Sequence, residues 1–342
     1  MHTGLFHTLD FNAEGKFFDF FSMPVSVDRS PYYQVKIPVC RLRRGSGPRI
    51  LLMAGNHGDE YEGEIVLGHL IRALDAAQIT GEITIMPAVN TPAVMAARRC
   101  SPLDAGNLNR SFPGNAAGGP TQRIAHFLEH VLFPMHDVVF DLHSGGTSMG
   151  HLGCALVERQ GTAAQFAHAL ELMQSTGMSY GFVAENGSTA PTSMAAAGRA
   201  GAIGLSGEFG GGGTVTPQSM ADTRAAVDRV LIKLGVTTAP VLGDHAPIAA
   251  PMQLLLLDTH EQNLFATRRC WFEPVVDLGA QVVRGQLAGW LHDFHRFDAA
   301  PEAVHFRESG VVISRRLHTD CESGDSLIQV ARPIDAAGVL GR

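Results

Sequence analysis

The sequence is poor in cysteine and has no arrangement of cysteines that indicates cross-links. Its five cysteines are odd in number and lie far apart, and no two of them form a C-x-x-C pair. Small secreted scaffolds and thiolate zinc sites both need closely spaced cysteines. We therefore expect neither a disulfide framework nor a cysteine-ligated metal, and a reducing cytoplasm is the compartment that this cysteine usage favours.

Positive charge and long apolar runs are also scarce. The 342 residues include only three lysines, and the formal net charge is −7, so no basic stripe is present that would attract nucleic acid or acidic membranes. The segment 1–20 is interrupted by acidic residues and lacks the basic region of a signal peptide. No stretch has the roughly eighteen uncharged apolar residues of a membrane helix. Neither nucleic acid nor a membrane is expected as a partner.

Apolar residues and histidine, by contrast, are abundant. Hydrophobic residues make up 45% of the sequence and charged residues 17%, which is typical of compact globular proteins and excludes a disordered chain. A chain of 342 residues is longer than one hydrophobic core usually supports, so we expect one large and one smaller domain. The 16 histidines direct attention to metal sites.

Between residues 49 and 233, short apolar runs alternate with longer segments of helical periodicity. This pattern predicts an α/β fold, a mixed or largely parallel sheet flanked by helices. We expect strands at residues 50–53, 83–87, 138–142, 152–157, 180–183 and 202–205. We expect helices around residues 67–74, 124–132, 163–174, 192–199 and 218–234.

The pattern changes beyond Gly235, where short β-like runs alternate with proline and glycine breaks. We place a catalytic domain at residues 1–240, with a β-rich lead-in over 1–45, and a smaller all-β domain at 241–342. The segment 271–290 is similar to biotinyl and lipoyl domains in its pattern. No lysine that could be modified follows Lys233, so a carrier function is excluded.

Ionisable residues follow three of the expected strands. His57 and Glu60, three residues apart, come after the first strand, His143 ends the third, and Glu208 follows the last. Ligands of open α/β sheets bind beyond the carboxyl ends of strands, so these loops are expected to converge. Two imidazoles and one carboxylate with an open fourth position are a ligand set of catalytic zinc. Glu208 is the candidate to take a proton from a zinc-bound water.

Other polar residues near these strand ends are candidates for supporting roles. Asp141 either orients His143 or packs beside it. The loop after the strand at 83–87 carries Arg98, Arg99, Asn107, Asn109 and Arg110, and arginine suits capture of a carboxylate or stabilisation of an oxyanion. Taken singly, each candidate also has a structural explanation as an exposed pair, a buried histidine, a helix cap or a solvated loop. Because such candidates occur at the ends of four expected strands, a functional site is favoured over a separate structural explanation for each residue.

One competing motif is His126-Phe-Leu-Glu129-His130, which matches the H-x-x-E-H pattern of inverted zinc proteases. At 100° per residue, His126, Glu129 and His130 lie opposite the apolar stripe of their expected helix. We therefore interpret these three side chains as a solvated face.

A second competing motif is the G-x-S-x-G pattern at residues 146–150, the nucleophile elbow of serine hydrolases. That elbow requires strand, serine and then helix. Ser148 is instead followed by the strand-like run at 152–157, so the context of the motif is wrong.

The chain resembles the succinylglutamate desuccinylase and aspartoacylase family over about residues 17–335. The motifs that carry the resemblance are Gly55-x-His57-x-x-Glu60, Asn109-Arg110, Asp141-x-His143-Ser144 and Glu208-x-Gly-Gly. The family is similar to zinc carboxypeptidases in its catalytic domain and adds a C-terminal β domain. The resemblance therefore implies a zinc carboxypeptidase-like mixed sheet followed by a smaller all-β domain.

The resemblance also implies a role for each matching residue. His57, Glu60 and His143 would bind one Zn²⁺ per chain, Glu208 would be the general base and acid, and Asn109 and Arg110 would hold a substrate carboxylate. The family's oxyanion arginine lies upstream of the Asn-Arg pair. Arg99 is the choice here, and the spacing leaves Arg98 open.

The expected reaction is hydrolysis of the amide of a small N-acyl amino acid. Longer runs at residues 98–114, 141–146 and 208–216 are most similar to the branch of the family that deacetylates Nα-acetyl-L-2,4-diaminobutyrate in ectoine breakdown. Deacylases of the acetyl-aspartate or succinyl-glutamate type, a serine hydrolase using Ser148 and a non-catalytic binding module are the alternatives. A homo-oligomer is left open by the sequence.

Overall fold

The computed structural model describes residues 4–341, whose strands form two sheets, one of fourteen strands and one of four. The order of the main path of the large sheet is β1-β2-β4-β3-β5-β9-β7-β8-β10-β18-β16-β13. Its strands are β1 Gly15–Val27, β2 Ser30–Arg44, β3 Arg49–Ala54, β4 Gly81–Met86, β5 Val138–His143, β6 Met149–His151, β7 Cys154–Glu158, β8 Tyr180–Ala184, β9 Ile203–Glu208, β10 Gln253–Leu257, β11 Asn263–Phe265, β13 Gln281–Val282, β16 Gly310–Arg316 and β18 Ser326–Pro333. The middle of this sheet is mixed, because β3, β4, β5 and β9 run parallel while β7 is antiparallel to β9.

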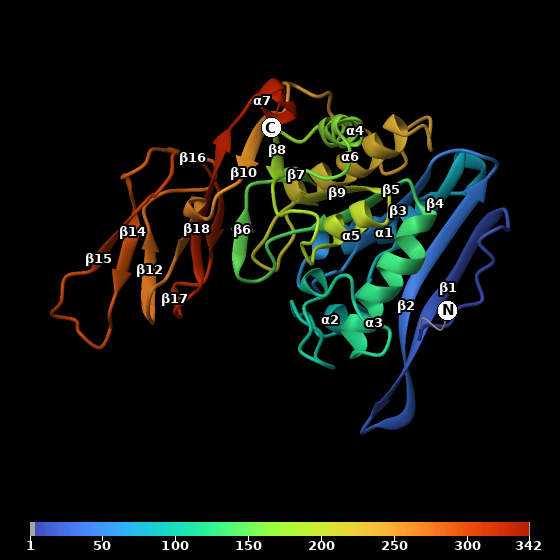
Figure 1. Ribbon diagram of the computed structural model, residues 1–342, viewed down its shortest axis with the longest axis horizontal. Coiled ribbons are helices and arrows are strands. Elements are labelled where there is room, and N and C mark those ends of the chain that lie inside the picture. The colour runs from blue at the N-terminus through green and yellow to red at the C-terminus, as the bar shows by residue number, and fades with distance from the viewer. Residues whose placement is uncertain (1–3, 342) are drawn as a thin grey trace.

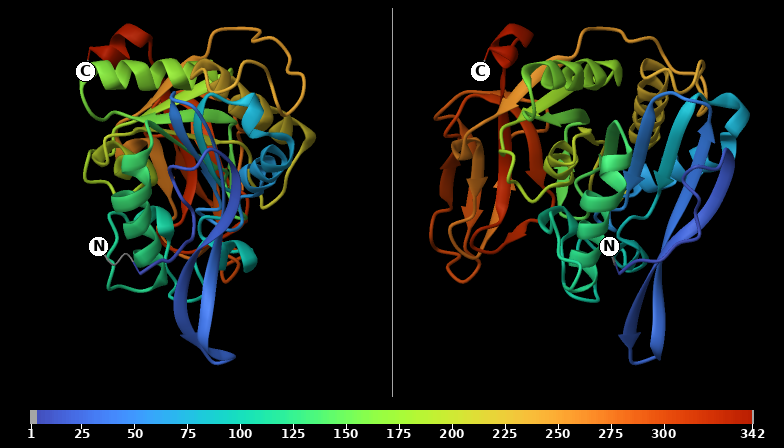
Figure 2. Two further views of the ribbon diagram at one scale, coloured as in Figure 1. Left: turned by 90° about the vertical axis from the view of Figure 1, so that its right-hand side faces the viewer. Right: turned by 45° about the vertical axis from the view of Figure 1, so that its right-hand side comes forward.

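The helices lie against both faces of the sheet (Figures 1 and 2). They are α1 Tyr61–Ala73, α2 Thr91–Met95, α3 Pro120–Phe127, α4 Ala163–Ser175, α5 Ser193–Arg199, α6 Pro217–Lys233 and α7 Ala336–Leu340. Each expected strand of the region 49–233 is present within three residues of its predicted bounds. The expected helices are present as well, although α1 begins six residues before its predicted start and the segment 124–132 is divided between α3 and a π-helix at Leu128–Leu132. The α/β sheet with flanking helices is therefore confirmed.

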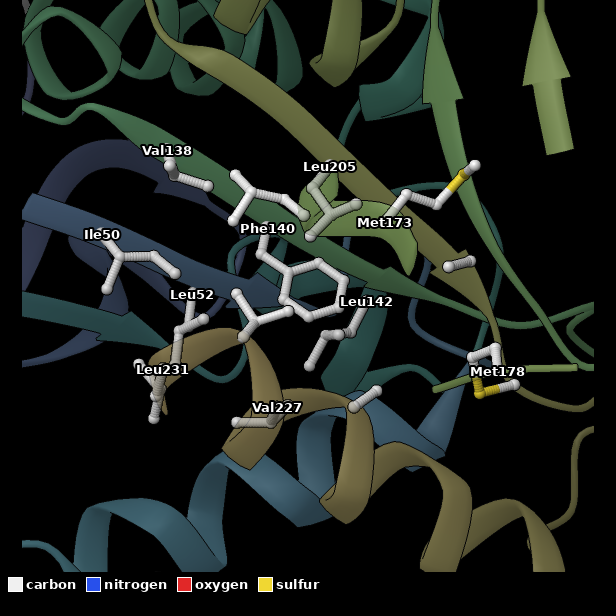
Figure 3. Packing of buried hydrophobic residues seen from close by; sticks show 14 of the residues in the cluster. Ile50, Leu52, Val138, Phe140, Leu142, Met173, Met178, Leu205, Val227 and Leu231 are labelled. Atoms are coloured by element: carbon white, nitrogen blue, oxygen red, sulfur yellow. The ribbon is translucent and has the colours of Figure 1, made fainter. Parts of the chain in front are cut away.

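The central strands are apolar almost throughout because both of their faces are covered. Along β3, Ile50 and Leu52 belong to the core under α1, α4 and α6, whereas Leu51 and Met53 belong to the core under α3 and α5. Phe140 of β5 packs in the first of these cores (Figure 3). Alternate side chains of a strand point to opposite faces, so a strand buried on both sides needs an unbroken apolar run.

The C-terminal region forms the smaller, mainly β part of the molecule, on the side away from the β1–β2 hairpin, and it ends in the short helix α7 (Figure 1). The four-stranded sheet has the order β15-β14-β12-β17. Its strands are β12 Cys270–Pro274, β14 Leu287–His292, β15 Glu302–His305 and β17 Asp320–Cys321. An apolar cluster between these strands and β16 and β18 gives this region a core of its own.

The large sheet continues across the predicted domain boundary at residue 240. β10 pairs in parallel with β8, and β18 pairs with β10, so strands of the C-terminal region extend the catalytic sheet. β6 of the N-terminal region pairs in turn with β16. The two parts are therefore joined by backbone hydrogen bonds. None of the helices within residues 4–341 combines the length and the hydrophobicity of a membrane-spanning segment.

Candidate active site

The first two candidate ligands lie on the turn between β3 and α1. Gly55 has a φ of +72°, a conformation that favours glycine, and it turns the chain sharply at the end of β3. A Cβ on Gly58 would lie 2.0 Å from the backbone of Ala93, so only glycine allows this turn to approach α2. The turn holds His57 beside the cap residue of α1, Glu60.

His57, Glu60 and His143 converge although 83 residues separate the last two in the sequence. Nδ1 of His57 lies 2.7 Å from Oε1 of Glu60, and Nδ1 of His143 lies 2.9 Å from Oε2 of the same carboxylate. One ligand atom from each residue can be chosen so that all lie within 4.8 Å of one another. All three side chains are buried. The predicted convergence is thus present in the structure.

Both imidazoles are held by their second ring nitrogen. Nε2 of His143 donates to Oδ2 of Asp141 at 2.8 Å, and Nε2 of His57 lies 3.1 Å from Oδ1 of Asn107. Metal-binding histidines are commonly anchored in this way, with the free nitrogen left to face the ion. The two nitrogens and the carboxylate are the donor types that zinc accepts. The residues present therefore fit a zinc ion.

The side chains of this cluster shift one another's pKa values. Burial disfavours the ionised Glu60 carboxylate, but the two imidazoles outweigh it and hold the pKa of Glu60 below its usual range. Burial likewise disfavours a charged His143, yet Asp141 and Glu60 raise its pKa well above the usual value. Positive charge on His143 compensates these buried carboxylates. A divalent cation would supply the same compensation.

Glu208 stands beside the cluster at the end of β9. Its position pairs with His143 in the parallel β5–β9 ladder, and its Oε2 atom is buried without a hydrogen-bond partner among the described residues. Burial and the negative charge of Glu60 raise the pKa of Glu208 to about 8. A carboxyl group that titrates near neutrality can both accept and return a proton.

The cluster opens into a cavity of about 480 Å³. His143, Glu208, Asn109 and Arg110 contribute to its wall, as do residues of β7, β8 and β10. Burial and the nearby Arg99 lower the pKa of Arg110. Arg110 nonetheless lines the cavity and is exposed to solvent, so its planar guanidinium is accessible to a carboxylate ligand.

The structure separates the two candidate oxyanion arginines. Nη1 of Arg99 lies 3.4 Å from Oε1 of Glu60 and 3.4 Å from Nδ1 of His57. Arg98 is exposed, and its carbonyl accepts a hydrogen bond from the backbone of Gly58. Of the pair, Arg99 is the side chain at the cluster.

Several contacts of the site were not predicted from the sequence. Asn107 was noted only as part of its loop, and its contact with His57 depends on how that loop folds. Ser193 at the start of α5 donates from Oγ to Asp141 and from its backbone nitrogen to Oδ1 of Asn109. The cap position of α5 is visible in the sequence, but its proximity to β5 is a tertiary feature.

The H-x-x-E-H motif was interpreted as a solvated face, and for one of its three residues this interpretation is wrong. Glu129 is buried, not solvated, and forms an ion pair with Arg199 at 2.8 Å. The helix changes to a π-helix over Leu128–Leu132, and the altered turn directs Glu129 towards α5. His130 is exposed and His126 only partly buried.

Ser148 lies in a turn that leads into β6 and not into a helix. It does not line the cavity that contains Glu208. The arrangement lacks the strand, serine and helix of a nucleophile elbow, as the sequence indicated.

Comparison with known proteins identifies close relatives over nearly the whole chain. The N-alpha-acetyl-L-2,4-diaminobutyric acid deacetylase of Halomonas elongata is 36% identical over 333 residues, which cover 97% of this chain and 96% of the relative. The product-bound structure of the ectoine utilization protein EutE (DoeB) from Ruegeria pomeroyi has a TM-score of 0.90 and 32% identity, and the match covers 97% of this chain and all of that one, 100%.

A further structure, a succinylglutamate desuccinylase/aspartoacylase from Rhodobacter sphaeroides, has a TM-score of 0.89 and 30% identity, with 97% of this chain and 100% of the other covered. The family model of the succinylglutamate desuccinylase/aspartoacylase catalytic domain matches residues 46–234, the segment that carries all the candidate site residues. The resemblance noted in the sequence is confirmed, and the chain belongs to the succinylglutamate desuccinylase/aspartoacylase family.

Proposed function

We propose that this protein is a zinc-dependent deacylase that hydrolyses Nα-acetyl-L-2,4-diaminobutyrate to acetate and diaminobutyrate. The observation that carries the proposal is the meeting of His57, Glu60 and His143 beside Glu208 in a cavity lined by Arg110. The substrate is supported by the similarity to the Halomonas elongata deacetylase over 97% of the chain.

His57 and His143, through Nδ1, and Glu60, through its carboxylate, would hold one zinc ion per chain. When bound, such an ion lowers the pKa of a water ligand to roughly 7 and polarises the acyl carbonyl. Asp141 and Asn107 keep the two imidazoles oriented for this role.

Glu208 is the general base and acid of the proposed reaction. Its carboxylate accepts a proton from the attacking water, and the same proton then passes to the departing α-amine as the C–N bond breaks. Burial, which raises the pKa of Glu208, favours the return of the proton from Glu208 to the amine. The products are acetate and the free amino acid, so the water is consumed and the proton is returned.

Arginines would stabilise charge at the two ends of the reacting group. Arg99, beside Glu60 and His57, stabilises the negative charge that develops on the carbonyl oxygen. Arg110 binds the α-carboxylate with a planar, bidentate donor group. Asn109 contributes to the same wall, while its Oδ1 is engaged by the backbone of Ser193.

The test is to purify the protein without added metal, measure its bound zinc and assay three substrates before and after chelation. We expect about one zinc per chain and release of acetate from Nα-acetyl-diaminobutyrate that the chelator abolishes. Faster hydrolysis of N-acetyl-aspartate or N-succinyl-glutamate would replace the proposed substrate. Activity that survives complete removal of the metal would refute the zinc mechanism.

A further inference from the structure

The cavity that contains Glu208 extends to an acidic wall. Glu158, Glu185 and Asp258 line it together with Arg110. Glu208 pairs with Cys154 across β9 and β7, and Glu158 lies four residues further along β7, a backbone distance of roughly 13 Å. The same cavity therefore contains both Glu208 and the carboxylate of Glu158.

Glu158 differs from the other two carboxylates in its partners. Glu185 lies 3.4 Å from Arg159, and Asp258 lies 3.0 Å from Arg332. Glu158 is 5% exposed and has no ion pair with any Lys, Arg or His of residues 4–341. Ion pairing usually compensates a buried carboxylate, so Glu158 is the carboxylate of this wall that is left without a direct cationic partner among the described residues.

Neutral donors fix the position of this carboxylate. Oε1 of Glu158 accepts hydrogen bonds from Asn186 at 3.0 Å and Thr192 at 2.9 Å, and Oε2 accepts one from Gln160 at 2.7 Å. These groups hold Glu158 as a hydrogen-bond acceptor without neutralising its charge. The neighbour of Thr192, Ser193, donates from its backbone to Asn109, so one turn positions both Glu158 and the predicted carboxylate site.

Two other atoms of the cavity wall lack partners. Oε2 of Glu208 and Nδ1 of His151 are buried without a hydrogen bond among the described residues. Buried polar atoms in native proteins are usually satisfied, so these atoms indicate a cavity built around a polar ligand. Arg110 lies close enough to Glu158 and Glu208 to feel both charges.

We propose that Glu158 binds a cationic side chain of the substrate and selects N-acyl amino acids that end in an ammonium group. This inference rests on the proposed function, because the α-carboxylate is taken to lie on Arg110. In a substrate whose side chain has two methylenes and an ammonium group, the negative α-carboxylate would face Arg110 and the positive ammonium would face Glu158. An aspartate or glutamate side chain in the same place would face a buried carboxylate, which disfavours it electrostatically.

The experiment compares two substrates of equal shape. Nα-acetyl-L-norvaline carries a methyl group where Nα-acetyl-L-2,4-diaminobutyrate carries its ammonium. Glu158→Gln is expected to lower kcat/KM for the cationic substrate by about 100-fold, because it removes one partner of a desolvated charge pair. The same variant should change kcat/KM for acetylnorvaline by less than about three-fold, since that substrate makes no charged contact with Glu158.

Matched controls are Glu185→Gln and Asp258→Asn, which remove the other carboxylates of the same wall. Both already have an arginine partner, so each should lower the cationic preference by less than about ten-fold. Equal losses with both substrates in Glu158→Gln would mean that Glu158 is structural. A selective loss in either control but not in Glu158→Gln would assign the ammonium to that residue and overturn the proposal.

Two further measurements keep the inference separate from folding and from the proposed reaction. If Glu158→Gln does not fold, Glu158→Asp is tested instead, because it moves the carboxylate back by one methylene. This variant should lower the preference for the cationic substrate. An unchanged preference would contradict the proposal. If the wild type hydrolyses neither substrate, the proposed function fails. Calorimetric binding of diaminobutyrate and norvaline to the wild type then tests the ammonium site, and equal affinities reject it.

Discussion

His143 and Glu208 occupy paired positions at the carboxyl ends of the neighbouring parallel strands β5 and β9. The pairing places a candidate metal ligand and a candidate proton carrier side by side without any contribution from a flexible loop. Sites carried on strands are held more precisely than sites on loops. Because each side chain is positioned by its own strand, substitution of Glu208 should leave His143 in place, and substitution of His143 should leave Glu208 in place.

Glu208→Gln should retain zinc and lose activity. The amide cannot accept the proton of the attacking water, so kcat should fall about 10²- to 10⁴-fold. Zinc content is measured beside kcat, and Glu208→Asp serves as the control that keeps a carboxylate. Full activity of a zinc-loaded Glu208→Gln protein would remove Glu208 from the mechanism.

Asp141→Asn should lower the affinity for zinc, while the protein should still fold. Asp141 accepts the hydrogen bond from Nε2 of His143, and loss of such an anchoring contact typically lowers metal affinity about 10- to 100-fold. Competition with a chelator gives the dissociation constant. Asp137→Asn is the matched control, because Asp137 precedes the same strand but pairs with Arg49 at an exposed position. Equal zinc affinities of the two variants would contradict the orienting role.

Arg110→Ala should raise KM with little change in kcat. A group that holds the α-carboxylate binds substrate and transition state alike, and loss of a charged hydrogen bond corresponds to a KM increase of about 10- to 100-fold. Steady-state kinetics provide both constants. The exposed Arg98 offers a control, and Arg98→Ala should behave as the wild type. A fall in kcat at constant KM would instead place Arg110 at the transition state.

The sequence was sufficient to predict the parts of the site that lie on regular strands. The apolar runs at 50–54 in β3 and 138–140 in β5 are followed by polar residues, so the ends of these strands, and with them His57 and His143, could be located. That such ends converge follows from the topology of open sheets. The fold class could be predicted for the same reason, because strand and helix periods alternate clearly between residues 49 and 233.

The rest depended on tertiary contacts that periodicity does not encode. The buried position of Glu129 follows from the π-helix at Leu128–Leu132, which changes the angle per residue on which the prediction relied. The contact of Asn107 with His57 requires a folded loop of irregular structure. Pairing of β10 with β8 joins residues on both sides of a segment rich in proline and glycine, where the sequence favours a boundary.

His151 provides a prediction about stability and pH. It belongs to β6, pairs with Ser314 of β16 and lines the cavity. Burial lowers its pKa from the ordinary value near 6.5 to about 4, despite the opposing charge of Glu60. Between these two values the unfolded chain binds a proton at this position and the folded protein does not. His151 therefore makes folding less favourable as the pH falls through this window.

Replacement of His151 by glutamine should reduce the loss of folding stability at low pH, because an amide stays uncharged at every pH. The full shift corresponds to at most about 3 kcal/mol, and since the ring is partly exposed to the cavity we expect about 1–2 kcal/mol. Urea unfolding of the chelated protein at several pH values between 4 and 7 measures the difference, without a contribution from metal binding. His168→Gln on the exposed side of α4 is the control and should keep the slope of the wild type. If the stability of His151→Gln falls with decreasing pH as steeply as that of the wild type, His151 is not a source of the acid sensitivity.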